Sequence, residues 1–137
     1  MTRRLVLLLP LAACLHADSA QEVRDLIAST AGALSAEKVA LFLDSFDRAM
    51  PGFDKLRRDV EGLTSQADIG CSIEITGNDG DDKVRTLTLD WILTIDKKDD
   101  SPGTIRRQKT VTCQVKKVGK NWRIVSFEPL DLFVSPG

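Results

Sequence analysis

Apolar side chains in the first half of the chain recur at intervals of three and four residues, which places them on one face of an α-helix. A capping box from Ser19 to Glu22 predicts the start of a first helix, and Gly32 is a natural stop for it. A second helix is predicted from Ser35 to Pro51, with an apolar stripe made of Val39, Phe42, Leu43, Phe46 and Met50. A third helix is predicted over residues 53–65, with an apolar side made of Leu56, Val60 and Leu63.

Beyond Gln66 the apolar and polar residues alternate, which predicts β-strands with one buried face. Turn residues separate four such strands, and the turns are predicted over residues 77–82, 97–103 and 118–121. Connections this short join antiparallel neighbours. We therefore expect an α+β fold in which N-terminal helices pack on one face of a curved, four-stranded antiparallel meander.

This strand order keeps two cysteines apart. Cys71 lies on the first predicted strand and Cys113 on the third, so one strand separates them. Two strand spacings amount to roughly 9–10 Å, whereas the Cα atoms of a disulfide lie within about 7 Å of each other. We expect two buried core thiols; a bond between them would require a different strand order.

The N-terminus has the pattern of an export signal. Arg3 and Arg4 precede a short apolar run over residues 5–13, which is too short to cross about 30 Å of hydrocarbon as a helix. The end of this run, Leu11-Ala12-Ala13-Cys14, resembles the bacterial lipobox, in which a cysteine after small residues is lipidated and becomes the mature N-terminus. The alternative is ordinary cleavage near Ala17 or Ala20, which would give a secreted protein.

The lipobox divides the chain into three parts: a lipoprotein signal peptide over residues 1–13, a tether over residues 14–19 and a single domain over residues 20–137. We accordingly expect lipidation at Cys14 and attachment of the exported protein to a membrane. The residue after the cysteine is Leu15 and not aspartate, which in the lipoprotein pattern favours the periplasmic side of the outer membrane in a cell that has one.

Charge and composition exclude several partners. The formal net charge is −1, both signs are mixed along the chain, and no basic stripe is present, so we expect no binding to nucleic acid. The acidic turns lack the spacing of an EF-hand, and no phosphate-binding glycine loop is present, so the sequence predicts no metal and no cofactor.

The order of elements resembles the nuclear transport factor 2-like superfamily, which includes SnoaL-like and cystatin-like cone domains. The resemblance rests on the closing run over residues 119–130, and on residues 87–91 followed by a long hairpin to Arg106 and Arg107. It implies a cone of helices and curved sheet around an apolar pocket. The expected pocket lining is Phe42, Phe46, Leu89, Trp91, Val111, Cys113 and Trp122.

Catalysis is not expected in this pocket. Enzymes of the superfamily, such as ketosteroid isomerases, SnoaL-like cyclases and scytalone dehydratase-like proteins, are similar in using aspartate, histidine or tyrosine inside the cone. This chain has no tyrosine, and its one histidine, His16, lies beside the lipobox. The best candidate base is Asp90, and strand alternation places it on the outer face of the sheet, opposite Trp91.

Three functions remain from the sequence. The first is a non-catalytic envelope lipoprotein that binds a partner protein or serves as an accessory domain; the second is a binder of a small apolar or amphipathic molecule; the third, disfavoured, is a SnoaL-like isomerase, cyclase or dehydratase. Arg107 and Lys109 are expected at the pocket rim, where they could hold an acid or could simply extend to water. The outer sheet face is polar with little charge and predicts a homodimer; its residues include Thr86, Thr88, Thr94, Gln108, Thr110, Thr112 and Gln114.

Overall fold

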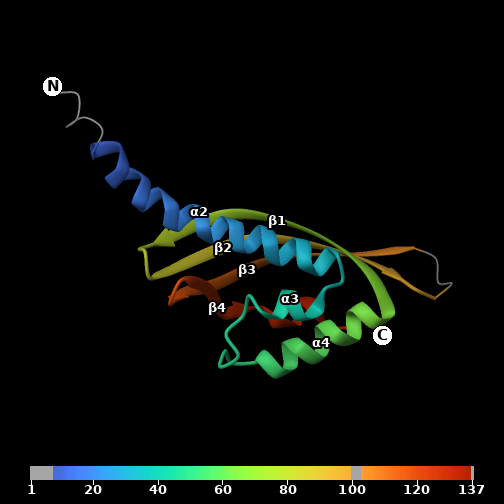
Figure 1. The fold of residues 1–137 in the computed structure, drawn as a ribbon. Helices are drawn as coiled ribbons and strands as arrows, with labels where there is room; N and C mark the ends of the chain where they lie inside the picture. The colour runs from blue at the N-terminus through green and yellow to red at the C-terminus, as the bar shows by residue number, and fades with distance from the viewer. Residues whose placement is uncertain (1–7, 100–102, 137) are drawn as a thin grey trace.

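The centre of the molecule is an antiparallel sheet with the strand order β1-β2-β3-β4. The computed structural model describes residues 8–99 and 103–136, with side chains from Ser19 onward. The strands are β1 Ala67–Gly80, β2 Val84–Lys97, β3 Thr104–Val118 and β4 Asn121–Glu128. They curve strongly, so the sheet has a concave and a convex face (Figure 1).

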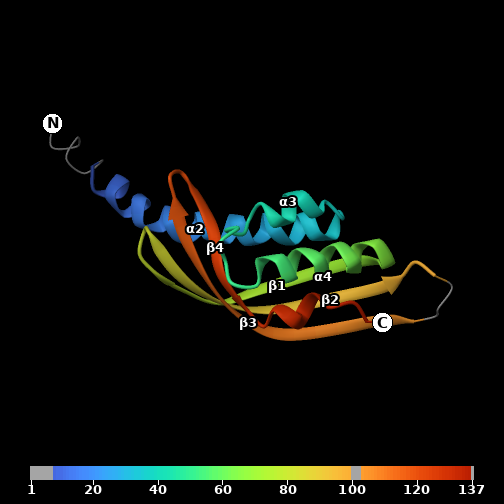
Figure 2. The ribbon, with the colours of Figure 1, turned by 90° about the horizontal axis from the view of Figure 1, so that it is seen from below.

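All the helices lie on the concave side of this sheet (Figure 2). They are α2 Leu8–Ser35, α3 Val39–Leu43, α4 Phe53–Gln66 and the short 3-10 helix η1 Leu130–Phe133, which follows β4. The first turns of α2 extend beyond the end of the sheet (Figure 1). The predicted α+β class, with helices on one face of a four-stranded meander, is therefore confirmed.

The predicted limits of the first helix are wrong. Ser19 is not a cap, because it is a buried residue inside α2, which the structure describes from Leu8 onward. Gly32 does not end the helix either: α2 continues to Ser35, and Glu37 adopts a positive φ of 60°. The amides of Glu37 and Lys38 bond back to the carbonyls of Leu34 and Ala33, which is a Schellman motif.

The predicted second helix is also too long. Only Val39–Leu43 is α-helical, and the chain then turns so that Phe46 forms a parallel bridge with Ile124 of β4. The amide of Ile124 donates to the carbonyl of Ser45, and the amide of Asp47 donates to the carbonyl of Ile124, both at 2.8 Å. The predicted apolar stripe is buried except for Val39, which is partly buried, but these sheet bonds replace the expected helical ones.

The first predicted turn lies too early in the chain. Residues 77–80 belong to β1, whose register with β2 shifts between Ile75 and Gly77, and the turn occupies residues 81–83. Gly80 permits this path because its φ is +143°, and an added Cβ would lie 2.3 Å from the carbonyl oxygen of Val84. The glycine needed by the hairpin is therefore Gly80.

Replacing Gly80 with alanine is expected to lower the free energy of unfolding by about 2–3 kcal/mol, because the side chain would meet backbone atoms in a conformation that side chains rarely adopt. Urea unfolding measures this loss. Gly119→Ala is the matched control, since Gly119 also has a positive φ but has open space around it, and about 1 kcal/mol is expected there. Equal losses in the two variants would contradict the clash at Gly80.

The two cysteines lie on the first and third strands, as the predicted strand order requires. Cys71 of β1 is opposite Leu93 of β2, and Cys113 of β3 is opposite Leu87, so the two thiols are separated both across and along the sheet. Both are free, as expected, and Cys113 is buried, but Cys71 is only partly buried, so the expectation of two buried core thiols holds for Cys113 alone.

Candidate functional site

Six of the seven residues predicted to line a pocket come together in the interior of the cone, and the seventh does not. The six are at most 1% exposed to solvent and belong to one apolar cluster: Phe42, Phe46, Leu89, Trp91, Val111 and Cys113. Trp122 also belongs to the buried cluster, but its indole edge faces a groove on the outside of the molecule. The cone interior is therefore assembled from α3, the segment after it that carries Phe46, β2 and β3, and the strand residues lie where the alternation of apolar residues predicts.

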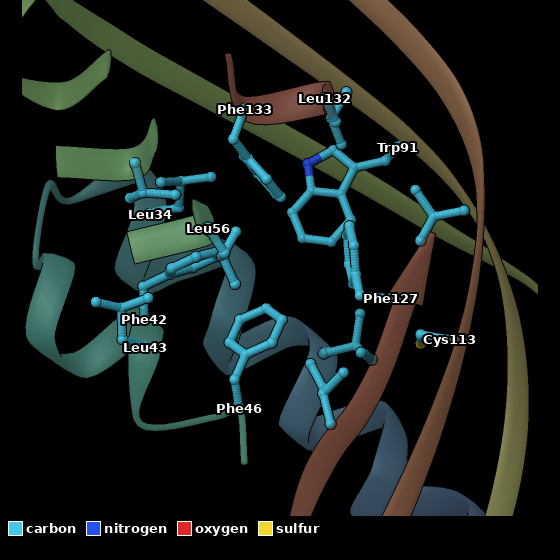
Figure 3. Packing of buried hydrophobic residues seen from close by; sticks show 14 of the residues in the cluster. Leu34, Phe42, Leu43, Phe46, Leu56, Trp91, Cys113, Phe127, Leu132 and Phe133 are labelled. Atoms are coloured by element: carbon cyan, nitrogen blue, oxygen red, sulfur yellow. The ribbon is translucent and has the colours of Figure 1, made fainter. Parts of the chain in front are cut away.

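Aromatic rings fill this interior. The Trp91 ring meets the rings of Phe127 and Phe133 edge to face, with centroids 5.5 Å apart in each pair. Phe42 lies 5.6 Å from Phe133, and Phe46 lies 5.8 Å from Phe127. Figure 3 shows these side chains converging from the helices, the sheet and the C-terminal segment. Rings at these separations are in favourable packing contact, so the chain's own side chains occupy the centre of the cone.

The C-terminal segment supplies the part of the site that the sequence analysis missed. Leu132 and Phe133 of η1 are fully buried, and Phe133 contacts three other rings of the cluster. A signal was present: two large apolar residues follow Pro129 and Leu130, with only Asp131 between them. A short tail at the end of a domain has no periodicity, however, and its burial could not be inferred from spacing.

The two predicted rim cations have different environments. Arg107 is half-buried, and its Nη1 donates to the carbonyl of Leu132 at 2.8 Å and also to the carbonyl of Val134. Lys109 lies opposite Trp91 in the strand register but is exposed. Arg107 therefore joins β3 to the C-terminal segment, whereas Lys109 faces water.

One polar atom in the cone is unsatisfied. Trp91 Nε1 is buried, and no described group meets it with hydrogen-bond geometry. An interaction with the Trp91 side chain lowers the pKa of the Cys71 thiol against the larger, opposite effect of burial, so the two are close, but a thiol is a weak acceptor. An unpaired buried donor costs about 1–3 kcal/mol.

Burial dominates the chemistry of both thiols. It raises the pKa of Cys113 from 9.0 to about 12, and it raises the pKa of Cys71 to about 12 against the smaller effect of Trp91. Only the thiolate is a strong nucleophile or metal ligand. Neither cysteine is therefore suited to nucleophilic catalysis near neutral pH.

The free energy of unfolding is expected to fall as the pH rises above 9, with a slope approaching about 1.4 kcal/mol per pH unit for each thiol. The unfolded thiols ionise near 9.0 and the folded ones near about 12, so only the unfolded state gains charge in this window. Below pH 9 the thiols are protonated in both the folded and the unfolded state, so their contribution to the free energy of unfolding is fully present there. Urea unfolding at pH 8, 9 and 10 measures the slope, and the double variant Cys71→Ala, Cys113→Ala should flatten it. The same slope in both proteins would contradict this prediction.

Asp90, the candidate base, lies on the convex face as predicted. Both of its carboxylate oxygens accept hydrogen bonds from Gln108 Nε2, at 3.0 and 3.2 Å. Among the described residues, no group of three or more histidine, cysteine, aspartate or glutamate side chains is placed to hold a metal ion.

A groove of about 690 Å³ lies outside the cone, between α2, the region of α3 and the start of β4. Its floor includes Trp122, whose Nε1 donates to Glu22 Oε1 at 3.3 Å. Leu41, which is 53% exposed, lies on its wall. The remaining lining is charged or polar: Glu22, Asp25, Ser29, Asp44, Ser45, Lys120, Asn121 and Arg123, with Leu26 partly buried beneath them.

The N-terminal predictions lie largely outside this description. Residues 1–7 of the predicted signal peptide are not among the described residues, and of Cys14 and the tether only the helical backbone of α2 is described. No helix in the described part of the chain is long and apolar enough to cross a membrane.

The helices, the curved meander and the aromatic interior define the nuclear transport factor 2-like cone. Solved structures share this fold. A conserved protein from Planctomyces limnophilus aligns with a TM-score of 0.71 and 7% identity over 78% of this chain and 91% of its own. A candidate scytalone dehydratase from Novosphingobium aromaticivorans gives 0.70 and 12% over 78% and 79%. An NTF-2 like protein of unknown function from Shewanella oneidensis gives 0.63 and 11% over 78% and 94%.

Identities this low establish the fold and not the activity. The sequence matches no family model, and no curated protein sequence matches it significantly.

Proposed function

We propose that the protein is a non-catalytic domain of the bacterial cell envelope, held at a membrane through lipidated Cys14, that binds a partner protein or serves as an accessory domain. The observation that carries this proposal is the filled interior: Phe42, Phe46, Trp91, Phe127 and Phe133 occupy the space in which a substrate would react. The buried thiols and the outward carboxylate of Asp90 also speak against catalysis.

The outer groove supports the choice of a protein partner. Exposed Leu41 and the edge of Trp122 provide apolar area, and carboxylates and cations surround them. An apolar centre with a polar rim is the usual composition of a protein–protein interface. The long α2 helix forms one wall of the groove, so the predicted anchor and the proposed interface belong to the same element.

Two measurements on the full chain, expressed in a bacterial host, test the proposal. The first is the mass of the mature protein and its partition between membrane and soluble fractions, for the natural chain and for Cys14→Ala. We expect a diacylglycerol-sized addition and membrane recovery for the natural chain only. A mature natural chain without lipid would contradict the anchor.

The second measurement is photo-crosslinking from a benzoylphenylalanine residue at position 41, with the same residue at position 58 on the exposed side of α4 as the control. We expect a discrete heterologous adduct from the groove and not from the control position. The same adducts from both positions, or turnover of a cyclic ketone or polyketide substrate by the purified protein, would contradict a partner-binding role for this groove.

We further propose a homodimer formed through the convex face of the sheet. The cross-strand pairs Thr88–Thr112 and Thr86–Gln114 lie on this face, and such groups lose little on desolvation when they are bonded again. Directly opposed carboxylates, Asp68 with Asp96 and Glu74 with Asp90, repel each other on one half of the face. Two β3 residues of the same face, Arg106 and Lys116, carry the opposite charge and would approach these carboxylates from a second copy.

Sedimentation at micromolar concentration should therefore give a dimer, and Thr112→Arg should give a monomer because it places a cation at the centre of the contact. Leu41→Arg, on the helical side of the molecule, is the control and should remain dimeric. A natural chain that sediments only as a monomer would refute the dimer.

A further inference from the structure

The C-terminal segment occupies the cone in the manner of a tethered ligand. The buried side chains of Leu132 and Phe133 fill the volume beside Trp91, and the backbone around them is held at the mouth of the cone by Arg107. The residues on either side of this pair are only partly buried or exposed. The segment thus combines an apolar body inside the cone with a polar attachment at the rim.

The segment satisfies this site incompletely. Trp91 Nε1 lies on the edge of its ring that faces Leu132 and Phe133 (Figure 3), and it has no hydrogen-bond partner. At the mouth, the guanidinium of Arg107 donates to the uncharged carbonyls of Leu132 and Val134. A carboxylate would bond to it more strongly and with matched planar geometry. The Trp91 N–H therefore has no acceptor, and the Arg107 guanidinium is bonded to carbonyls, which are weaker acceptors than a carboxylate.

We propose that the space under the C-terminal segment is an exchange site for an amphipathic carboxylic acid, which displaces Leu132 and Phe133 and binds through Arg107. The acid's carboxylate takes the place of the two backbone carbonyls. Its apolar body takes the place of the two side chains, and close packing requires about eleven carbon atoms to fill that volume. An oxygen along this body would also accept from Trp91 Nε1. This inference goes beyond the partner-binding function and does not depend on it.

The exchange also explains why the cone contains a cation at its mouth. A guanidinium beside an apolar interior is costly to desolvate unless it is bonded, and in the closed state the tail supplies those bonds. When the tail leaves, Arg107 needs a replacement acceptor, and a ligand without a negative charge provides a poorer one. The site should therefore select by charge as well as by chain length.

The test uses dodecanoate, which has the required body and charge, below the concentration at which it forms micelles. Its binding to the full chain is measured by calorimetry, and hydrogen exchange of residues 130–135 is followed with and without it. Dodecyltrimethylammonium, with the same chain and the opposite charge, is the control ligand. We expect dodecanoate to bind and to accelerate exchange of the C-terminal segment, and the cationic control to do neither.

Two variants sharpen the result. Phe133→Ala weakens the hold of the segment and should tighten dodecanoate binding by about tenfold, because less packing must be displaced. Arg107→Gln removes the cation and should weaken binding by about tenfold even though it also loosens the segment. If Phe133→Ala does not fold, the exchange experiment on the natural chain still decides. Binding without faster exchange at residues 130–135, equal binding of both ligands, or no binding would each overturn the proposal.

Discussion

Replacing Trp91 with alanine is expected to lower the free energy of unfolding by about 4 kcal/mol, the range typical of a buried tryptophan or phenylalanine truncated in a core. Trp91 is fully buried and contacts the rings of both Phe127 and Phe133, so its removal leaves a cavity shared by β2, β4 and the C-terminal segment. Such a cavity cannot collapse without moving the sheet. Urea unfolding followed by circular dichroism measures the loss.

Two comparisons isolate the cause of this effect. Leu41→Ala, at a 53% exposed position, should change the free energy of unfolding by less than about 0.5 kcal/mol. Trp91→Phe should cost much less than Trp91→Ala, because it keeps a ring in the cluster and removes the unpaired N–H. If Trp91→Phe and Trp91→Ala are equally destabilising, the packing of the ring is not what stabilises the cone.

Arg85→Met is expected to destabilise the protein by about 3 kcal/mol, because it removes three hydrogen bonds donated by a buried charged group. Arg85 Nε donates to Asn78 Oδ1 at 2.8 Å, and its two Nη atoms donate to the carbonyls of Asn78 and Asp81. Asn78 in turn donates to the carbonyl of Ala20 at 3.3 Å. The guanidinium therefore joins the β1–β2 hairpin and α2.

The hairpin is further ordered by Asp81, whose pKa is held below its usual range by the backbone N–H groups of Val84 and Lys83. Arg58→Met on the exposed side of α4 is the matched control, with an expected change of less than about 0.5 kcal/mol. Thermal unfolding of the two variants compares them directly. Similar midpoints would show that the Arg85 bonds are exchanged for water without loss.

The sheet could be predicted because the alternation of apolar and polar residues fixes both the pairing register of the strands and the face on which each side chain lies. Leu87, Leu89 and Trp91 are buried in turn, and Asp90 faces outward, as their spacing requires. The same alternation, extended two residues back from Leu87, would have placed Arg85 on the concave face. An arginine interrupts the apolar pattern, however, and its burial depends on the acceptors that Asn78 and Asp81 supply.

The helical half was less predictable, since several of its features depend on contacts with distant residues. Phe46 has helical spacing from Phe42, yet it leaves the helix and pairs with Ile124, far away in the sequence, in a bridge whose hydrogen bonds are made by Ser45 and Asp47. Ser19 has the side chain of a cap but is buried within α2. Similarly, seven pocket residues could be selected from the sequence, but the filling of that pocket by Phe133 depends on where the tail folds.

The bridge at Phe46 means that the two edge strands of the sheet are protected in different ways. It covers part of the outer edge of β4, whereas β1, at the other end of the sheet, pairs with one strand only. A long open edge of this kind invites strand addition by other chains. The irregularity between Ile75 and Gly77, together with the outward carboxylates of Asp68 and Glu74, disfavours such pairing. We therefore expect β1 to resist such pairing, and substitution of Asp68 and Glu74 by their amides to weaken that resistance.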